Sequence, residues 1–411
     1  MAKTITVFYR PGGGTYGLFQ LATERAIEKS LGVQSGELSD VNLSCSIGSN
    51  HGCLTKINAP RADGKFLFSS GDLIDPMINV AVKMCGHTTT DKHYKGLSFD
   101  DVRRCLGRFV GKKTASLRYD SGIYKKSLNE SIGDLELGEL SGSHIIPTHL
   151  VDRERNVCFS KLNPNMFDMQ GMVSMDSLGD DISVTNAIMA STPAPLTFPS
   201  YEIEGIGKFI DYAHAFNIGE TMRDIFRMAD IKARANVAFN GAVDLPNIRL
   251  VVIGTGYDSK KKFDINKMDT EGTLLNMSDL IKHPSVANAH SSLRSLKADF
   301  KDRLDVHIWD VDKARYTAPE KIKNADDGFS GDPEHLKWKV DIATQEAKLH
   351  HDARMRVAEQ IMEEKQQVID PLSNFACAVK TEQSSMLSRL FSFPWRVSAE
   401  RAPKPQTATL H

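Results

Sequence analysis

The feature that most constrains the fold is a short apolar run, followed by a cluster of glycines and then a helical pattern. Residues 5–9, ITVFY, predict a buried strand, and residues 18–31 predict a helix that ends at Gly32. Between them lies RPGGGTYG at 10–17, which leaves the backbone bare at the end of the strand. A strand that leads directly into a helix is typical of α/β proteins.

The rest of the chain continues this alternation, which predicts an α/β fold. We expect a three-layer sandwich, with helices on both faces of a mostly parallel central sheet and a helical C-terminal part. Residues 33–64, rich in Ser, Gly and Asn, predict loop with weak strand character. Further strands are predicted at 65–70, in 143–161 as a pair joined by a turn at DRER, and at 248–256. Further helices are predicted at 72–86, 98–110, 121–133, 184–195 and 346–367.

Composition excludes several classes of protein. The 411 residues carry a formal net charge of −1, which argues against nucleic acid as a partner. No run approaches the roughly 18 apolar residues of a membrane span, and MAKTITVFYR lacks the apolar core of a secretory signal. The six cysteines are scattered without a CxxC pair, which favours a reduced, cytosol-like compartment over disulfides or a zinc site. We expect no metal and no cofactor.

The glycine cluster has three interpretations. Gly12, Gly14 and Gly17 match GxGxxG, but a dinucleotide site expects an acidic residue at the end of the next strand, and KSLGVQSGELSD offers no such strand. A tight turn without a ligand is the second interpretation. The third is an oxyanion hole, in which backbone N–H groups of Gly12, Gly13 and Gly14 face a developing negative charge.

An oxyanion hole needs a nucleophile, and two serines qualify. Ser69 in KFLFSSGDLID follows a predicted buried strand, with Gly71 two residues later and an apolar helix beyond, as in a nucleophile elbow. Ser46 in SCSIG is its rival, but GSNHGC after it predicts a poor helix, so Ser69 is preferred. A strand-end hydroxyl without a role is the alternative for either serine.

The candidate base is an aspartate. Asp211 in FIDYAHAFN follows a short apolar run and precedes small residues, so its carboxylate is expected to face a cleft. None of the thirteen histidines stands in a telling motif. An ordinary turn aspartate is the alternative for Asp211.

Taken in order, these segments resemble the patatin-like phospholipase family of acyl hydrolases. GGGTYG at 12–17 resembles the family's GGGxRG turn, LFSSG at 67–71 its GxSxG, and DYA at 211–213 its D-G-G or D-G-A. ASTPAPLTFPS at 190–200 and GTG at 254–256 resemble its proline-rich stretch and late glycine turn. The resemblance covers roughly residues 4 to 365.

The resemblance implies a serine lipid acyl hydrolase with a catalytic dyad. Ser69 would be the nucleophile and Asp211 its base, acting without histidine on fatty acyl esters of phospholipids or other lipids. The acyl hydrolase domain would span 1–365, with an extension at 366–411. Tyr16, Gly17, Gly71 and Tyr212 would support the site. Because Tyr16, Leu67 and Tyr212 replace motif residues, the alternative is a catalytically degenerate member that binds lipid or a protein partner.

The C-terminal segment has a different composition. Residues 386–397, MLSRLFSFPWRV, interleave Phe391, Phe393 and Trp395 with arginines, which predicts contact with a membrane surface. A strand or coil packed on the catalytic domain is the alternative. The expected location is cytoplasmic or peripheral at a membrane, with a secreted effector that lacks a cleaved signal as a further option, and a protein activator is a possible partner.

Overall fold

The computed structural model describes residues 3–59, 65–85, 121–195, 197–213, 215–236, 243–257, 291–320, 322 and 330–366. The chain divides into two compact units, Met1–Glu359 and Gln360–His411. Every contact discussed below belongs to the first unit. The helix predicted at 98–110 and the membrane-contact segment predicted at 386–397 lie outside the described residues.

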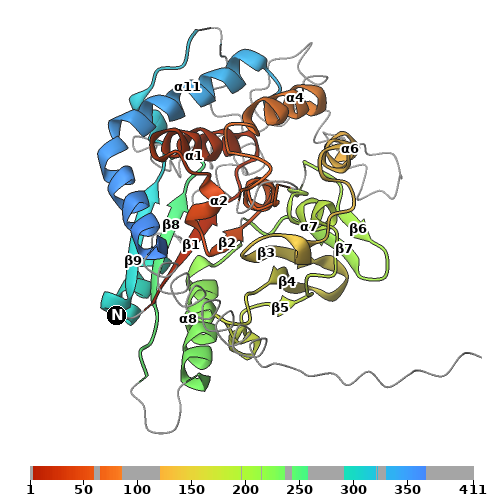
Figure 1. The fold of residues 1–411 in the computed structure, drawn as a ribbon. Helices are drawn as coiled ribbons and strands as arrows, with labels where there is room; N and C mark the ends of the chain where they lie inside the picture. Colours follow the sequence, from red (N-terminus) through yellow and green to blue (C-terminus); the bar gives the residue numbers. More distant parts are fainter. Residues whose placement is uncertain are drawn as a thin grey trace, which may run out of the picture. The chain divides into compact units, whose positions relative to one another are not determined.

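A mostly parallel sheet forms the centre of the first unit (Figure 1). The strands lie in the order β5-β4-β3-β2-β1-β8-β9, so β1 lies beside both β2 and β8. The neighbouring strands β3, β2, β1, β8 and β9 all pair in parallel. The hairpin β3–β4 is antiparallel, and β6 and β7 pair with each other and with β3. The strands are β1 (Thr4–Arg10), β2 (Val41–Ser44), β3 (Ser143–Leu150), β4 (Arg155–Lys161), β5 (Asp176–Ser177), β6 (Tyr201–Ile203), β7 (Gly207–Ile210), β8 (Asn247–Ile253) and β9 (Leu304–Trp309).

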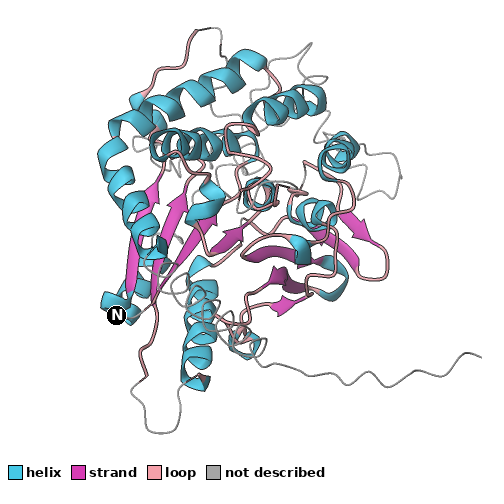
Figure 2. Cartoon of the chain, viewed as in Figure 1, coloured by secondary structure: helices cyan, strands magenta, loops and turns pink. Residues whose placement is uncertain are grey.

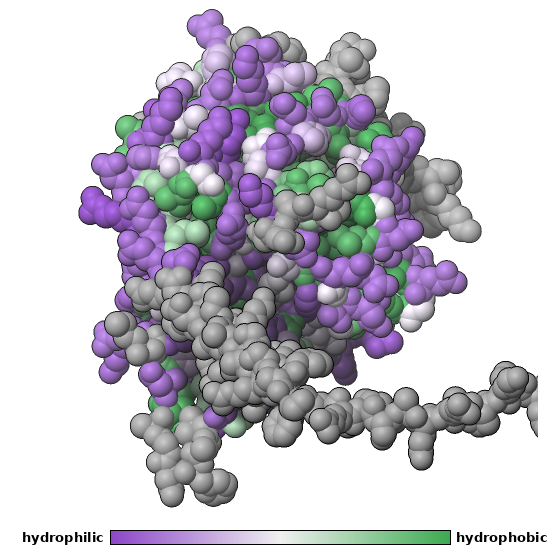
Figure 3. Space-filling view, viewed as in Figure 1, coloured by the Kyte–Doolittle hydropathy of each residue, from purple (hydrophilic) through white to green (hydrophobic). Residues whose placement is uncertain are grey.

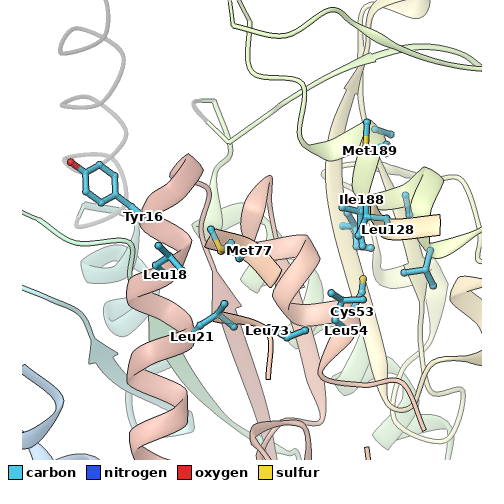
Figure 4. Close-up of a cluster of buried hydrophobic side chains, with 14 of the residues drawn as sticks. Tyr16, Leu18, Leu21, Cys53, Leu54, Leu73, Met77, Leu128, Ile188 and Met189 are labelled. Carbon is cyan, nitrogen blue, oxygen red and sulfur yellow. The ribbon is translucent and has the colours of Figure 1, made fainter. Parts of the chain in front are cut away.

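Helices cover both faces of this sheet, so the predicted α/β three-layer fold is confirmed (Figure 2). On one face α1, α3, α4, α6, α7 and α11 share an apolar cluster, part of which is drawn in Figure 4. On the other face α8 packs with alternate residues of β1 and β8, among them Ile5, Val7 and Leu250. The helices include α1 (Gly17–Leu31), α2 (Ser35–Leu38), α3 (Ile47–Leu54), α4 (Ile74–Cys85), α6 (Ser121–Ile132), α7 (Val184–Ser191), α8 (Ile218–Ala235) and α11 (Pro333–Leu349), and residues 291–300 and 351–366 are also helical.

Local sequence signals account for the ends of several helices. Gly32 adopts the left-handed conformation after α1, with φ 69°, and its N–H donates to the Glu28 carbonyl, as the sequence predicts. The Asn217 side chain accepts hydrogen bonds from the first N–H groups of α8. Asp332 caps α11, and Pro333 occupies its first turn.

Two sequence predictions for residues 33–70 are wrong. The segment 33–64, expected to be loop with weak strand character, contains the helices α2 and α3 besides the strand β2. Residues 65–70, expected to be a buried strand, make only an isolated bridge between Phe66 and Asn58 within the part that the structure describes. A short apolar run does not by itself establish a buried strand: here Leu67 is exposed and Phe66 packs against Gly36 of α2.

The surface is dominated by polar side chains, with apolar patches between them on the face drawn in Figure 3. Within the described ranges, no helix is both long and apolar enough to cross a membrane.

Candidate active site

Ser46 occupies a sharp turn between β2 and α3. β2 ends at Ser44 and α3 begins at Ile47, so two residues separate strand from helix. The Ser46 backbone has φ 52° and ψ −128°, a sparsely populated conformation that costs a non-glycine residue about 1–3 kcal/mol. A serine held in a strained strand-to-helix turn is the geometry of a nucleophile elbow. Ser46 therefore has the backbone geometry expected of a nucleophile.

Glycine and serine residues let α3 pack closely against the strands behind the turn. A β-carbon on Gly48 would lie 2.1 Å from the Arg10 carbonyl oxygen, and one on Gly52 would lie 2.9 Å from Ser44 Oγ. The Cys45 N–H donates to that same Arg10 carbonyl at 3.0 Å. The sequence that predicts a poor helix therefore forms one, because tertiary packing requires small residues here and outweighs intrinsic propensity.

Ser69, the preferred nucleophile of the sequence analysis, lies in a different setting. Its hydroxyl donates to Asp72 Oδ2 at 2.6 Å, and its N–H donates to the same oxygen at 2.8 Å. This pair closes the turn that precedes α4, and Gly71 in that turn packs beside Arg25. The structure thus places the Ser69 hydroxyl in a turn-capping pair with Asp72.

Asp211 follows β7 and is 95% buried, with a relative exposure of 5%. Its N–H donates to the Pro193 carbonyl at 3.1 Å, and its Oδ1 accepts from the Ala213 N–H at 2.7 Å. Burial raises the pKa of the Cys45 thiol well above its usual value, and the negative charge of Asp211 raises it further. The carboxylate therefore acts electrostatically on the residue that precedes Ser46.

Gly12 lies between Ser46 and the segment that begins at Asp211. A β-carbon on Gly12 would come 2.8 Å from the β-carbon of Ser46 and 2.7 Å from that of Ala213. On its other side the glycine-rich turn is backed by Thr255, whose hydroxyl donates to the Gly12 carbonyl at 3.1 Å and whose side chain leaves no room for a β-carbon on Gly13. Gly14 has φ 58°, the left-handed region that favours glycine. The turn therefore approaches Ser46 and the Asp211 segment with bare backbone.

The sheet topology explains why these segments meet. The glycine-rich turn, Ser46 and Thr255 follow β1, β2 and β8, three adjacent parallel strands, and so stand at the same edge of the sheet. From β1 the chain continues to β2, which pairs on one side of β1, and β8 later pairs on the other side of β1. Ligands of open α/β sheets bind outside the carboxyl ends of the strands at such a switch point.

An apolar cavity opens beside Ser46. Gly14, Thr15 and Ser46 line one part of it. Apolar side chains of α4, including Met77 and Val80, form much of the remainder, and α6 contributes Leu128 together with three serines, Ser121, Ser127 and Ser131. Figure 4 shows Met77 and Leu128 with neighbouring side chains of α1, α3 and α7. A group bound here would meet the Ser46 hydroxyl at the polar end of an apolar chamber.

Two predicted supporting residues pack against histidines. Gly17 lies against His51, since a β-carbon there would be 2.7 Å from His51 Cε1. Burial lowers the pKa of His51 to about 3, and its Nδ1 pairs with Gln20 Oε1 at 2.8 Å. Its ring is therefore neutral at physiological pH. Tyr212 stacks on His149 with ring centroids 6.4 Å apart, and its hydroxyl accepts from Asn156 at 2.8 Å.

A buried carboxyl group braces the glycine-rich turn from behind. Asp310 Oδ1 accepts from the N–H groups of Gly256 and Val311, at 2.7 and 2.8 Å, and so fixes the loop that carries Thr255. Burial raises the Asp310 pKa to about 6, against the lowering effect of those hydrogen bonds and of Arg354. Because the pKa is raised in the folded state, Asp310 favours folding at low pH and loses that contribution as pH rises through about 6.

We expect Asp310→Asn to stabilise the protein at pH 7. Asparagine keeps the Oδ1 acceptor and removes the buried charge, so the free energy of unfolding should rise by up to about 3 kcal/mol, with the gain vanishing near pH 4. Urea unfolding of both proteins from pH 4 to 8 measures this. Asp176→Asn, at an exposed carboxylate, is the control and should show no such trend. A less stable Asp310→Asn protein at pH 7 would contradict the expectation.

Among the described residues, no group of three or more His, Cys, Asp or Glu side chains is placed to hold a metal ion. Cys45, Cys53 and Cys158 are buried free thiols.

The similarities of this chain to known proteins are structural. No protein-family model matches the chain, and no curated protein matches it. Among solved structures, it is similar to VipD from Legionella pneumophila, with 11% identity, a TM-score of 0.30, and coverage of 85% of this chain and 67% of that one. It is similar to human GIVD cytosolic phospholipase A2 in complex with methyl gamma-linolenyl fluorophosphonate, with 11% identity, a TM-score of 0.37, and coverage of 88% and 60%.

A third similar structure is that of ExoU from the type III secretion system of Pseudomonas aeruginosa in complex with SpcU. It has 10% identity and a TM-score of 0.28, with 97% of this chain and 66% of that chain covered. The chain thus spans between 60% and 67% of the length of these structures. At identities and TM-scores this low, no residue role follows from the likenesses.

Proposed function

We propose that this protein is a patatin-like serine acyl hydrolase that cleaves carboxylic esters of apolar acyl chains, with lipid esters as the substrate class. In this proposal Ser46, and not Ser69, is the nucleophile, and Asp211 is its base. One observation carries the assignment: Ser46 sits in a strained strand-to-helix turn at the polar end of an apolar cavity, and Gly12 packs between it and the Asp211 segment.

The chemistry follows from these positions. Ser46 Oγ attacks the ester carbonyl carbon while the Asp211 carboxylate accepts the hydroxyl proton. The tetrahedral oxyanion faces the backbone N–H groups of Gly13 and Gly14, and its collapse expels the alcohol, which takes a proton as it leaves. Water then hydrolyses the acyl-serine ester by the same steps. Catalytic hydrogen bonds are often long in ligand-free sites, and we expect Ser46 and Asp211 to come into hydrogen-bond contact with substrate bound.

Two further features support this proposal. The cavity beside Ser46 is lined mainly by apolar side chains, which suits an acyl chain better than a sugar or a nucleotide. Ser46 also satisfies the nucleophile pattern better than Ser69, because Ser44 is small and Gly48 is required by its contact with Arg10.

An alkyl fluorophosphonate probe tests the nucleophile directly. We expect the wild-type protein and Ser69→Ala to be labelled, with the adduct on the peptide that contains Ser46, whereas Ser46→Ala should remain unlabelled. Mass spectrometry of the digested protein locates the adduct. Labelling at Ser69, or no labelling of the wild type, would contradict the proposal and favour a catalytically degenerate protein that binds lipid or a protein partner.

A further inference from the structure

Lys339 is a fully buried lysine on α11 whose ammonium group reaches the glycine-rich turn. Its side chain has 0% relative exposure, and its Nζ donates to Thr15 Oγ1 at 2.7 Å. The two residues are 324 positions apart in the sequence. A buried ammonium is costly to desolvate, so its position is a specific feature of the fold.

The packing of α11 along α1 holds this lysine in place (Figure 1). A second hydrogen bond ties the same two helices, from Arg25 of α1 to Thr344 Oγ1 at 3.2 Å. Lys339 Nζ also lies 4.0 Å from the ring centroid of Tyr16, and Lys313 Nζ lies 4.5 Å from it. Figure 4 shows the Tyr16 ring directed away from Met77, which belongs to the cavity wall.

Thr15 connects this charge to the candidate active site. Thr15 and Gly14 line the same cavity as Ser46, and Thr15 lies in the short helical turn at Gly14–Tyr16. A hydroxyl that accepts a hydrogen bond from an ammonium group is itself a stronger donor, and its backbone is held in place. Tyr16, which adjoins Thr15, has no charge of its own to offer at neutral pH.

We propose that Lys339 is a positioning residue that gives the glycine-rich turn its positive charge through Thr15, so that residues 12–17 bind an anionic oxygen beside Ser46. The anion is the oxyanion of the proposed ester hydrolysis, on which this inference rests, and also the carboxylate of the released acid. Lys339 acts through its hydrogen bond to Thr15 and its contact with the Tyr16 ring, although it is distant from both in the sequence.

Product binding tests the inference without turnover. Octanoate and octanamide share an acyl chain and differ in charge, so calorimetric titration with each measures the preference for an anion. We expect the wild type to prefer octanoate, and Lys339→Met to lose about tenfold in octanoate affinity while its octanamide affinity is unchanged. Lys337→Met, an exposed lysine on the same helix, is the matched control and should behave as the wild type.

Kinetics separate a charge effect from a packing effect. With a nitrophenyl octanoate substrate, Lys339→Met should lower kcat about 10- to 100-fold and leave KM within about twofold, since the charge acts mainly on the transition state. Adding Tyr16→Arg to Lys339→Met returns a cation to the turn and should recover part of the loss. Circular dichroism melts establish that each variant is folded.

The outcomes distinguish this inference from the proposed function. Wild-type protein that binds octanoate no better than octanamide, or Lys339→Met with unchanged octanoate affinity, would overturn the role of Lys339. A Lys339-dependent preference for octanoate in a protein that neither hydrolyses esters nor labels at Ser46 would leave the anion site standing and overturn the hydrolase proposal. Failure of Tyr16→Arg to restore kcat would indicate that Lys339 acts by packing alone.

Discussion

Replacing Ser46 by alanine is expected to abolish ester hydrolysis, with a fall in kcat of about 10⁴-fold or more, while Ser69→Ala retains wild-type kinetics. The reason is chemical: without the Ser46 hydroxyl no acyl-enzyme forms, and the remaining backbone donors accelerate only direct attack by water. We expect Ser69 to take no part in this step, because its hydroxyl donates to Asp72 in the turn before α4. Release of octanoate from a nitrophenyl ester measures both variants.

The same release of octanoate from a nitrophenyl ester tests Asp211 as the base. Asp211→Asn preserves an Oδ1 acceptor for the Ala213 N–H but cannot take up a proton, so kcat should fall about 10²- to 10⁴-fold. Asp72→Asn is the matched control and should leave kcat near the wild-type value, because Asp72 partners the turn serine. Comparable losses in the two asparagine variants, or full activity of Ser46→Ala, would contradict the Ser46 and Asp211 assignment.

Local patterns predicted the parts of this molecule whose structure is set locally. The strand at 5–9, the helix at 18–31 and its end at Gly32 depend on apolar period and on a terminal glycine, which are readable in the sequence. The glycine-rich turn and Asp211 were found in the same way, since each follows an apolar strand. These residues lie beside one another in the structure through Gly12 and Ala213.

The sequence favours Ser69 over Ser46, the nucleophile that we propose, because the signal for the Ser46 turn depends on distant packing. In SCSIG the small residue Ser44 stands two residues before Ser46 and Gly48 stands two residues after it. This matches the pattern of a nucleophile elbow better than the segment around Ser69, which has Leu67 in the first position. Residues 48–53 have weak helix propensity, which lowers the rank of Ser46, yet Gly48 and Gly52 are what lets α3 lie against Arg10 and Ser44. The role of Lys339 is hidden for the same reason, since only the packing of α11 on α1 brings it to Thr15.

A buried ion pair between Arg10 and Glu24 lies next to the Ser46 turn. Its loss is expected to lower the free energy of unfolding more than any other change proposed for this protein. Arg10 has 0% relative exposure, and its Nε and Nη2 donate to the two carboxylate oxygens of Glu24, both at 2.9 Å. A further nitrogen of Arg10 donates to Asn42 on β2. Burial would raise the Glu24 pKa, but the charge and hydrogen bonds of Arg10, together with the smaller effects of Ser35 and His51, hold the pKa below its usual value. The pair fixes the end of β1, whose carbonyl receives the Cys45 N–H.

We expect Arg10→Met to lower the free energy of unfolding by about 3–5 kcal/mol at pH 7, because it leaves the Glu24 carboxylate buried without its cation. Arg10→Met with Glu24→Met should recover much of the loss, since two apolar side chains replace two charges. Arg155→Met, from an ion pair whose two side chains are 67% and 62% exposed, is the control and should cost at most about 1 kcal/mol.

The pH dependence of this deficit identifies its cause. The lowered Glu24 pKa contributes stability to the wild type that is present above the unfolded pKa, near 4.3, and is lost as pH falls through the folded value. In Arg10→Met the carboxyl should instead have a raised pKa, so that its penalty appears as pH rises. The gap between the two proteins is therefore expected to be widest at neutral pH and to narrow below pH 4. A gap of constant size would show that Arg10 contributes mainly by packing, and the elbow beside its carbonyl would then depend on the shape of its side chain and not on its charge.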